Sequence, residues 1–549
     1  MSARMKREGR TGFEGWHAVP LFFGPLLLLA AIAAPARAED PYSPGGWSTL
    51  HQGPDNRKLV AAAPIDGPYR TWTALAGASV LTAPTLSPDG RTLYVTTGKA
   101  AGHSNLHAFD IEGTLLWQSE PWQDADRGVD PCAILSSPIV DLEGDVYIGD
   151  CNQLFAYREG GALKWIAALP PIKPGDWRAS KKLPINALTT AVFTADGDVL
   201  GVTNFGDVVV FDRATGERLN RPQRLPGHLP PPTAMKLARS MFGRGLMDPE
   251  IRDWAWQLLM GGRMRSANTP AIDLTTGRVY VAATSRTAGQ GALYGLDVLR
   301  HQRTAGTGEF RDGVTSDFEG PEVEVRLAFA TDMGPGSGSS PALSPEGDRV
   351  YVSDEKGLLY AIDARTGAPR GAVPTKAASA AAAVAANGDI LVLRSVGAPL
   401  LAVTRKGKTR WESDLSALTR AALPTAGVLG EPVAIGNGNP TVVGDEVLVP
   451  VIYGYETNRG RRIPWPVRSF LVAVDLETGR GVRNVVELVD DSTGITAVLP
   501  DGTILSSLGA GITSSVSPLA RIARWLLPDD LEPLAAVGGL QVSRPVDAR

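Results

Sequence analysis

One sequence pattern recurs along the chain, and it limits the possible folds more than any other feature. Each copy contains a short apolar strand, a turn with glycine, a second β-rich strand, and a third strand that ends in a further turn. Copies include "TAPTLSPDGRTLYVTTG", "SSPIVDLEGDVYIGD", "NTPAIDLTTGRVYVAAT" and "SSPALSPEGDRVYVSDEKGLLYAIDARTG". Self-similarity of this kind indicates a repeat architecture, in which one closed array can absorb a long chain.

The strands and turns of one unit follow from its residues. "DVYIGD" and "RVYVSD" alternate with period two, which is typical of strands that bury one face. A glycine such as Gly144 supplies the positive φ of the first hairpin. In the later turn, for example Asp363–Gly367, the carboxylate can accept hydrogen bonds from turn amides. Tryptophan follows this turn in several units, where its ring can fill the gap against the neighbouring unit (Trp117, Trp165 and Trp411).

The number of repeats predicts the fold class. A single unit cannot bury both of its faces, so many units must stack. Four strands per unit and about eight units predict an all-β chain folded as a single closed β-propeller. We expect eight four-stranded blades; seven is the alternative, because the pattern degrades after "ITAVLPDGTILSSL". Trp47–Leu50 is expected to add a strand to the last blade and close the ring, with Gly539–Pro545 as a late strand nearby.

The N-terminus is typical of an export signal. A basic start precedes the apolar run Val19–Ala34, and the small-residue pattern at Ala36 and Ala38 predicts cleavage after Ala38. Residues 1–38 are therefore predicted to be a signal peptide and residues 39–549 the propeller, located in the periplasm or secreted. An uncleaved membrane anchor is the alternative, although the apolar run is shorter than the roughly 20 residues that span a bilayer. After signal cleavage we expect no integral membrane segment.

The two cysteines of the chain predict a disulfide. Cys132 and Cys151 form an even pair, and such pairs are usually oxidised in exported proteins. The sequence between them predicts two short strands around a turn at Asp141–Gly144, and this hairpin would bring the thiols opposite each other. Two free buried thiols are the alternative.

The repeats also resemble a known family. The strand, the glycine turn, "YAIDARTG" and the following tryptophan are similar to repeats of the pyrroloquinoline-quinone (PQQ)-binding-like β-propeller family, and "GWSTLHQGPDNRKL" resembles the segment that leads into such propellers. The likeness extends from about Trp47 onward. An eight-bladed quinoprotein dehydrogenase implies PQQ held flat near the channel, a Ca²⁺ bound by carboxylate and amide oxygens, a catalytic Asp and, in many members, two adjacent cysteines stacked on the cofactor.

The residues that this chemistry needs do not stand out in the sequence. Cys132 and Cys151 are not adjacent, and no histidine cluster has metal-binding spacing. The aspartates of the repeats are better explained as turn residues (Asp110, Asp212, Asp297, Asp363 and Asp475). We therefore assign no catalytic or metal-ligating residue. PQQ and calcium are cofactors that only the resemblance implies.

The first of two insertions in the repeat pattern covers about residues 229–265 and is predicted to be helical. Asp248 can cap a helix that has Pro249 at its first position. An apolar stripe then recurs at helical spacing (Ile251, Trp254, Ala255, Leu258 and Leu259). Because such a stripe needs a core to cover, we expect a helical cap packed on the propeller. A lid or a partner-docking element is the alternative.

The second insertion, residues 453–468, holds the candidate ligand-binding residues. Tyr455 and Trp465 stand close in sequence to three arginines (Arg459, Arg461 and Arg462). Aromatic faces beside guanidinium groups suit a planar or sugar-like ligand that bears carboxylates. A solvated hairpin tip is the alternative reading.

These observations favour binding over catalysis. We expect an exported, monomeric propeller that acts as a binding or scaffold protein for a protein or glycan partner. A lipoprotein that assists outer-membrane protein assembly has the same type of repeat, although this chain has no cysteine near the predicted cleavage point. A PQQ-dependent dehydrogenase of an alcohol or sugar is the alternative. The net charge of −4 gives no general attraction to nucleic acid, so none is expected as a partner.

Overall fold

The computed structural model contains a compact unit, Asp40–Arg549, and the predicted signal peptide lies outside the described residues. The structure describes residues 40–62, 65, 67–123, 127–173, 185–231, 249–259, 262–301, 322–336, 338–377, 381–394, 397–426, 429–436, 438–456, 464–492, 494–509, 525 and 527–546.

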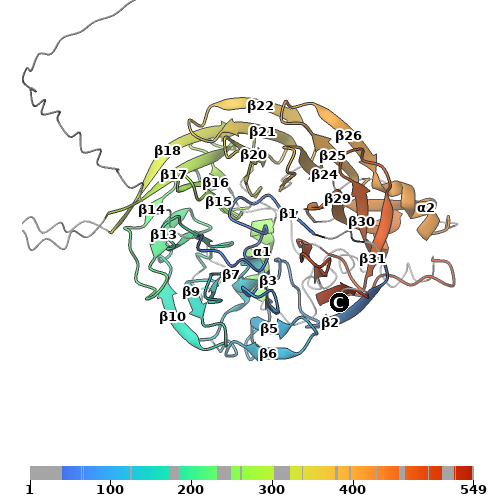
Figure 1. Ribbon diagram of the computed structural model, residues 1–549, viewed down its shortest axis with the longest axis horizontal. Coiled ribbons are helices and arrows are strands. Elements are labelled where there is room, and N and C mark those ends of the chain that lie inside the picture. The colour runs from blue at the N-terminus through green and yellow to red at the C-terminus, as the bar shows by residue number, and fades with distance from the viewer. Residues whose placement is uncertain are drawn as a thin grey trace, which may run out of the picture. The chain divides into compact units, whose positions relative to one another are not determined.

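Seven four-stranded sheets and one six-stranded sheet form a ring, which confirms the eight-bladed β-propeller (Figure 1). Four strands of the six-stranded sheet make up its blade. The strands of each blade are given from the centre of the ring outward. Blade 1 contains β3 (Thr85–Leu86), β4 (Thr92–Thr96), β5 (Leu106–Asp110) and β6 (Leu115–Gln118). Blade 2 contains β7 (Ile139–Val140), β8 (Val146–Gly149), β9 (Gln153–Tyr157) and β10 (Leu163–Ala168). Blade 3 contains β11 (Val192–Phe193), β12 (Val199–Val202), β13 (Asp207–Phe211) and β14 (Gln223–Arg224).

The next four blades continue around the ring. Blade 4 contains β15 (Ala271–Asp273), β16 (Arg278–Thr284), β17 (Gly291–Arg300) and β18 (Val323–Met333). Blade 5 contains β19 (Ala342–Leu343), β20 (Arg349–Ser353), β21 (Leu358–Asp363) and β22 (Pro369–Pro374). Blade 6 contains β23 (Ala383–Val384), β24 (Ile390–Leu393), β25 (Pro399–Val403) and β26 (Thr409–Asp414). Blade 7 contains β28 (Thr441–Val443), β29 (Glu446–Glu456), β30 (Pro464–Asp475) and β31 (Arg483–Leu488), and β27 (Pro432–Gly436) also pairs with β29.

Blade 8 closes the ring by combining the two ends of the described chain. It contains β32 (Ala497–Val498), β33 (Ile504–Leu508) and β34 (Gly539–Pro545), and its outermost strand is β2 (Tyr69–Ala74). β2 runs antiparallel to β34, from Tyr69 opposite Pro545 to Ala74 opposite Leu540. The late strand at Gly539–Pro545 was therefore predicted correctly. The prediction that Trp47–Leu50 closes the last blade was wrong, because β2 provides that strand.

Residues 47–60, which we call the inner segment, instead follow the innermost strands around the ring. Their carbonyl oxygens accept hydrogen bonds from innermost-strand amides of blades 1, 2, 4, 5, 6 and 7. The pairs are Trp47 from Leu86, Ser48 from Val140, Pro54 from Ile272, Asp55 from Leu343, Arg57 from Val384 and Lys58 from Val442. β1 (Leu59–Val60) then pairs parallel with β28. The innermost strand of each blade has one edge that no other strand of the blade covers. The inner segment provides hydrogen-bond acceptors for some of the backbone amides on these edges.

Side chains of the inner segment fill the space between the blades. Trp47, Asn56 and Lys58 are buried. The Asn56 side-chain amide donates to the carbonyl oxygen of Pro341 at 2.9 Å, and Lys58 Nζ donates to that of Ala382 at 2.7 Å. Burial lowers the pKa of Lys58 to about 7, because a charged ammonium loses its hydration there. The polar groups of this segment therefore bind the blades to one another.

The predicted helix in the first insertion is confirmed as α1 (Pro249–Leu259). Ile251, Trp254, Ala255 and Leu258 are buried, as the apolar stripe requires. Asp248 lies outside the described residues. Shorter helical turns are η1 (Pro131–Leu135), η2 (Leu415–Leu418) and α2 (Thr419–Ala422).

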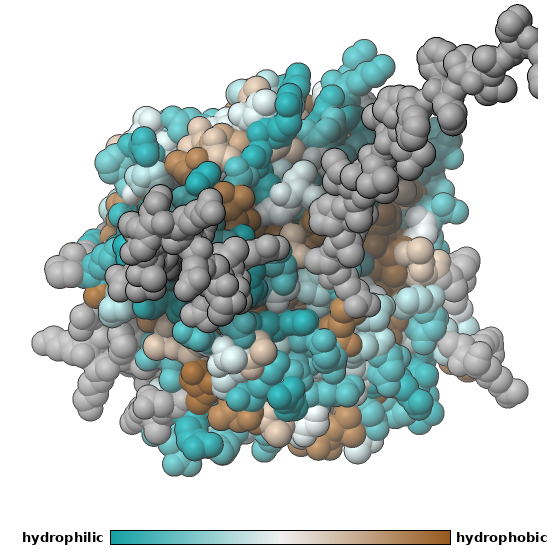
Figure 2. Space-filling model, turned by 60° about the vertical axis from the view of Figure 1, so that its left-hand side comes forward, coloured by the Kyte–Doolittle hydropathy of each residue, from teal (hydrophilic) through white to brown (hydrophobic). Residues whose placement is uncertain are grey.

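The described surface shows no segregation into large polar and apolar faces on the side shown in Figure 2, where hydrophilic and hydrophobic residues are interspersed. None of the helices in the described part of the chain combines the length and the hydrophobicity that crossing a bilayer requires.

Candidate functional site

The disulfide between Cys132 and Cys151 is confirmed, with the two Cα atoms 5.0 Å apart. Its local setting differs from the prediction. Cys151 follows β8 as expected, and the turn at Asp141–Gly144 is present, since Gly144 N donates to Asp141 O at 3.1 Å. Cys132, however, lies in η1 rather than in a strand. The Asp130 carboxylate caps η1 by accepting from Cys132 N at 2.8 Å, which explains why the chain turns there.

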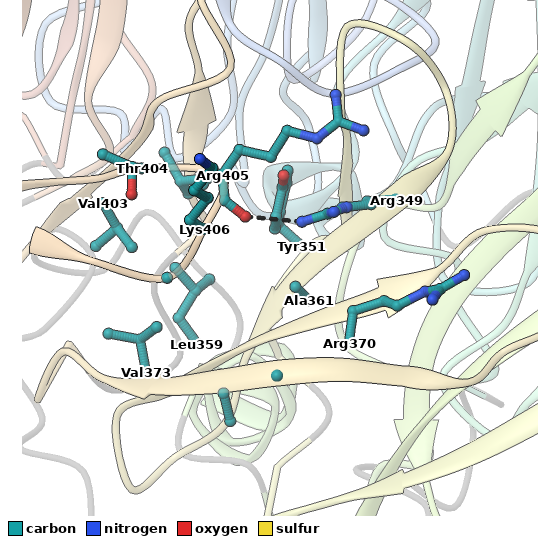
Figure 3. Close-up of a pocket in the computed structure, with 14 residues that line it drawn as sticks. Arg349, Tyr351, Leu359, Ala361, Arg370, Val373, Val403, Thr404, Arg405 and Lys406 are labelled. Carbon is teal, nitrogen blue, oxygen red and sulfur yellow. Dashed lines mark hydrogen bonds between the residues drawn. The ribbon is translucent and has the colours of Figure 1, made fainter.

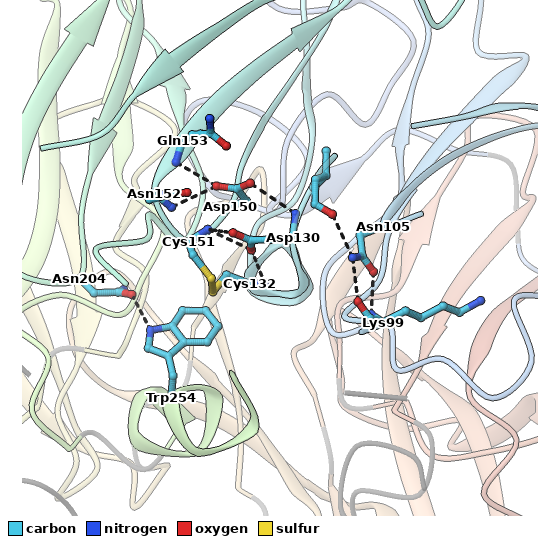
Figure 4. The surroundings of a disulfide bond; sticks show 11 residues. Lys99, Asn105, Asp130, Cys132, Asp150, Cys151, Asn152, Gln153, Asn204 and Trp254 are labelled. Atoms are coloured by element: carbon cyan, nitrogen blue, oxygen red, sulfur yellow. Dashed lines mark hydrogen bonds between the residues drawn. A yellow bond between two sulfur atoms is a disulfide. The ribbon is translucent and has the colours of Figure 1, made fainter. Parts of the chain in front are cut away.

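A buried carboxyl pair supports the backbone on both sides of this disulfide (Figure 4). Asp130 also accepts from Cys151 N at 3.1 Å, and Asp150 accepts from the amides of Asn152 and Gln153. Burial raises the pKa of Asp130, and the neighbouring Asp150 raises it further. Burial likewise raises the pKa of Asp150 to about 6. These carboxyl groups are occupied in holding the loop, so they have few acceptor positions left for a ligand.

Helix α1 packs against the disulfide. Ile251, Trp254 and Leu258 belong to one buried cluster with both cysteines. Trp254 Nε1 donates to Asn204 Oδ1 at 3.3 Å, which fixes the indole beneath the disulfide in Figure 4. The apolar face of the disulfide is thus covered by the chain's own side chains.

The residues at this disulfide do not fit a quinone stacked on it with a bound Ca²⁺. Trp254 and its neighbours already pack where a flat cofactor would meet the sulfurs. Within the described residues, one group of three side chains has metal-binding proximity, Asp130 with Cys132 and Cys151. Because both sulfurs belong to the disulfide, this group offers a single carboxylate, and the neighbouring Asp150 is engaged with the amides of Asn152 and Gln153. Ca²⁺ requires six to eight oxygen ligands.

The candidate ligand residues of the second insertion are only partly described. Arg459, Arg461 and Arg462 lie outside the described residues, and Trp465 is placed only by its backbone, opposite Tyr455 in the β29–β30 pair. The Tyr455 side chain is buried, and its hydroxyl donates to Pro424 O at 2.7 Å. A carboxylate-binding site at this hairpin stays a prediction.

A tryptophan on the outermost strand of one blade packs against the next blade at several places in the ring. Each indole lies against the glycine of the neighbouring blade's last turn and donates its N–H to a carbonyl in that turn. The pairs are Trp72 with Gly113 and Ile111 O, Trp117 with Gly161 and Glu159 O, Trp165 with Gly216 and Arg213 O, and Trp411 with Gly479 and Leu476 O. Phe329 takes the same position against Gly367. The predicted gap-filling role of Trp117, Trp165 and Trp411 is confirmed.

Glycine replaces this aromatic residue between blades 5 and 6. Trp411 stands opposite Ala402 immediately after a β-bulge, and Gly371 stands opposite Ala361 at the same point of its own blade. A Cβ added to Gly371 would meet no atom within 4 Å. A cavity of about 370 Å³ lies here, within the size range of ligand pockets (roughly 300–1,000 Å³). We call this cavity the slot.

The slot has an apolar floor and a cationic rim (Figure 3). Tyr351, Leu359 and Val403 form the floor and are buried. The rim consists of Arg349, Arg370, Arg405 and Lys406. Arg349 Nη1 donates at 2.7 Å to Arg405 O, the carbonyl that corresponds to the indole acceptors of the filled interfaces.

Sequence reasoning missed the slot, although a signal was present. The fifth repeat reads "YAIDARTGAPRGAV", with glycine where the sixth repeat "LLAVTRKGKTRW" has tryptophan. The missing tryptophan becomes meaningful only once the structure shows that this residue packs on the next blade.

Comparisons with known proteins agree with this architecture. The sequence matches the family PQQ_2, described as "Outer membrane protein assembly factor BamB", over residues 9–234 and 322–486. No curated protein matches the chain in sequence. The solved structure titled "Europium-containing methanol dehydrogenase" has a TM-score of 0.55 and 14% identity, with 92% of this chain and 98% of that chain covered.

Two further solved structures also match. Quinohemoprotein alcohol dehydrogenase ADHIIG from Pseudomonas putida HK5 has a TM-score of 0.51 and 14% identity, covering 91% of this chain and 80% of that chain. BamB from Moraxella catarrhalis has a TM-score of 0.46 and 12% identity, covering 87% of this chain and 99% of that chain. At 14% identity, the likeness to the two dehydrogenases shows a shared fold and does not transfer an activity.

Proposed function

Because this chain belongs to the PQQ_2 family, described as outer membrane protein assembly factor BamB, we propose that it is an exported binding propeller that docks a partner protein on its blades. The predicted signal peptide, residues 1–38, supports export to the periplasm or beyond it. The family description supports a protein partner. A rigid ring that presents loops and blade junctions is a common platform for binding.

One observation carries this proposal: the disulfide face is packed, whereas the slot is open. Over the disulfide, Ile251, Trp254 and Leu258 of α1 occupy the position that a stacked cofactor would need. Between blades 5 and 6, a concave site with a buried apolar floor and charged rim lies at the surface. Interfaces of proteins concentrate binding energy in such pockets, which receive a side chain from the partner.

Photo-crosslinking tests the proposed function. A photoreactive amino acid at Lys408, which is exposed in the blade 6 turn beside the slot, is expected to give a defined protein adduct in the cells that produce this chain. The matched control is Arg158, an exposed residue in the corresponding turn of blade 2, which should give no such adduct. Equal labelling from both positions, or stoichiometric binding of added PQQ and Ca²⁺ to the purified protein without any adduct, would contradict a protein-docking role.

A further inference from the structure

The filled interfaces show how an aromatic ring would lie in the slot. In each of them, the ring covers a glycine with positive φ in the next blade's turn, and a side chain there would collide with the ring, as the 2.6 Å approach of a Cβ at Gly479 to Trp411 illustrates. Gly407, with φ of 76°, provides the same platform at the slot. Its nearest neighbour is Val373, at 3.3 Å from a Cβ added to Gly407. The glycine platform is therefore retained, and a methyl group of Val373 covers part of it in place of an indole.

Arg349 does not block a guest ring, because the same arrangement coexists with a ring in the preceding interface. Arg278 begins β16 as Arg349 begins β20, and Arg278 Nη1 donates to the turn carbonyl of Ala364. The Arg278 guanidinium also lies 5.9 Å from the centroid of the Phe329 ring. Arg349 is thus placed to stack on an aromatic guest, a contact that is favourable for guanidinium groups.

The floor of the slot contains a polar group without a partner among the described residues. The buried Tyr351 hydroxyl makes no hydrogen bond, whereas Tyr280, at the same place in β16, donates to Ala364 O at 3.1 Å. Burial raises the pKa of Tyr351, and the guanidinium groups of Arg349 and Arg405 act in the opposite direction. The equivalent Tyr94 hydroxyl of blade 1 also makes no hydrogen bond, although Trp117 packs beside it. The Tyr351 hydroxyl therefore offers a hydrogen bond to a guest but does not by itself distinguish the slot.

Charge distinguishes the slot from the other blade junctions. The corresponding turns of five other blades each carry a carboxylate (Asp110, Glu159, Asp212, Asp363 and Asp475). The blade 6 turn, residues 404–408, reads "TRKGK" and carries none. Arg405 pairs with Glu346 and Asp348, and Arg370 pairs with Asp363, whereas Lys406 makes no ion pair with a described residue. Asp348 also lies 3.8 Å from Arg349, so Lys406 is the rim cation that has no carboxylate partner among the described residues. Because the side chains that line the slot include no carboxylate, the charge of Lys406 favours an anionic partner.

We propose that the slot binds an aromatic side chain, tryptophan or phenylalanine, from a partner protein segment whose flanking residues are acidic. The ring lies over Gly407 beside Gly371, and the flanking carboxylates face Arg370, Arg405 and Lys406. This inference rests on the proposed protein-docking function and adds the chemistry of the partner. The partner's ring would complete this interface as the protein's own aromatic side chain does at five other junctions of the ring.

A pair of peptides provides the test. Acetyl-Asp-Asp-Trp-Asp-Asp-amide is titrated calorimetrically into the purified protein, alongside the same peptide with alanine in place of tryptophan. The tryptophan peptide is expected to bind about tenfold more tightly or better. Gly371→Trp, which supplies the missing ring from the chain itself, should abolish this binding, and Gly371→Ala should retain it. Lys406→Glu, at an exposed position, should weaken binding several-fold and keeps the test valid if Gly371→Trp does not fold.

Each outcome of the titration is decisive. Equal binding of the two peptides, unchanged binding to Gly371→Trp or to Lys406→Glu, or no binding by either peptide would overturn the aromatic, acidic guest. Adducts that still form at position 408 while neither peptide binds would leave the docking function standing and reject only this guest. If no adduct forms at position 408 and neither peptide binds, both the docking function and the aromatic, acidic guest are rejected.

Discussion

Trp165→Ala is expected to lower the free energy of unfolding by about 3–5 kcal/mol. The Trp165 side chain is 8% exposed, and a Cβ at Gly216 would lie 2.6 Å from its ring, so the indole fills the junction between blades 2 and 3. Its Nε1 donates to Arg213 O at 3.0 Å. Alanine would leave a cavity and remove this hydrogen bond, and both effects add to the cost.

Trp525 provides a matched control for this substitution, since its side chain is 88% exposed. Trp525→Ala should change the free energy of unfolding by less than about 0.5 kcal/mol. The two variants are compared with the unaltered protein by urea denaturation, followed by circular dichroism. Similar midpoints for both variants would contradict the role of Trp165 as a wedge between blades.

Removal of the disulfide by Cys132→Ala with Cys151→Ala is expected to cost about 3 kcal/mol. The bond joins residues 19 positions apart, and a loop of roughly this length restricts the unfolded chain by about that amount. The cysteines also lie in the cluster covered by α1, so the loss of the sulfurs reduces packing under Trp254. Alanine is chosen because serine would bury hydroxyl groups among apolar side chains.

Reduction of the unaltered protein controls for the substitutions. A thiol reductant should lower its urea midpoint toward that of the double variant and should not change the midpoint of the variant itself. An equal midpoint for the oxidised protein, the reduced protein and the double variant would show that the disulfide does not contribute to stability.

The repeating parts of the fold could be predicted because their causes are local. The strands β8 and β20 and the glycine of each hairpin could be predicted from neighbouring residues. The prediction that these strands bury only one face was wrong, because both faces are buried where blades pack on each other. The blade count followed from counting such units. The prediction of α1 also depended only on the spacing of apolar residues within one segment, and the burial of Ile251 and Trp254 confirmed it. The disulfide followed from the number of cysteines and the hairpin between them, although the η1 turn at Cys132 was not foreseen.

The closure of the ring could not be predicted in the same way. Residues 47–60 lack an alternating pattern, because each carbonyl serves a different blade rather than one continuous partner strand. "YRTWTA" in β2 alternates only from Thr71 to Ala74, and its partner β34 lies at the other end of the chain. Pairing across such a distance leaves no trace in local periodicity.

The slot depends on the same kind of long-range information. Glycine at position 371 is unremarkable in a turn-rich sequence, and its meaning comes from Gly407 in the next blade. The candidate residues of the second insertion show the reverse case. Tyr455 looked available beside arginines, but it is buried with its hydroxyl bonded to Pro424 O.

The vacancy between blades 5 and 6 can be measured without any partner, by comparing the urea midpoints of Gly371→Trp and Gly371→Ala. Both variants place a side chain at a φ of 150°, so they share the same backbone cost, and only tryptophan can fill the cavity. We predict that the tryptophan variant is more stable than the alanine variant by about 1–3 kcal/mol, because its ring buries apolar surface over Gly407. Equal stability, or a less stable tryptophan variant, would contradict the conclusion that this interface has an open tryptophan site.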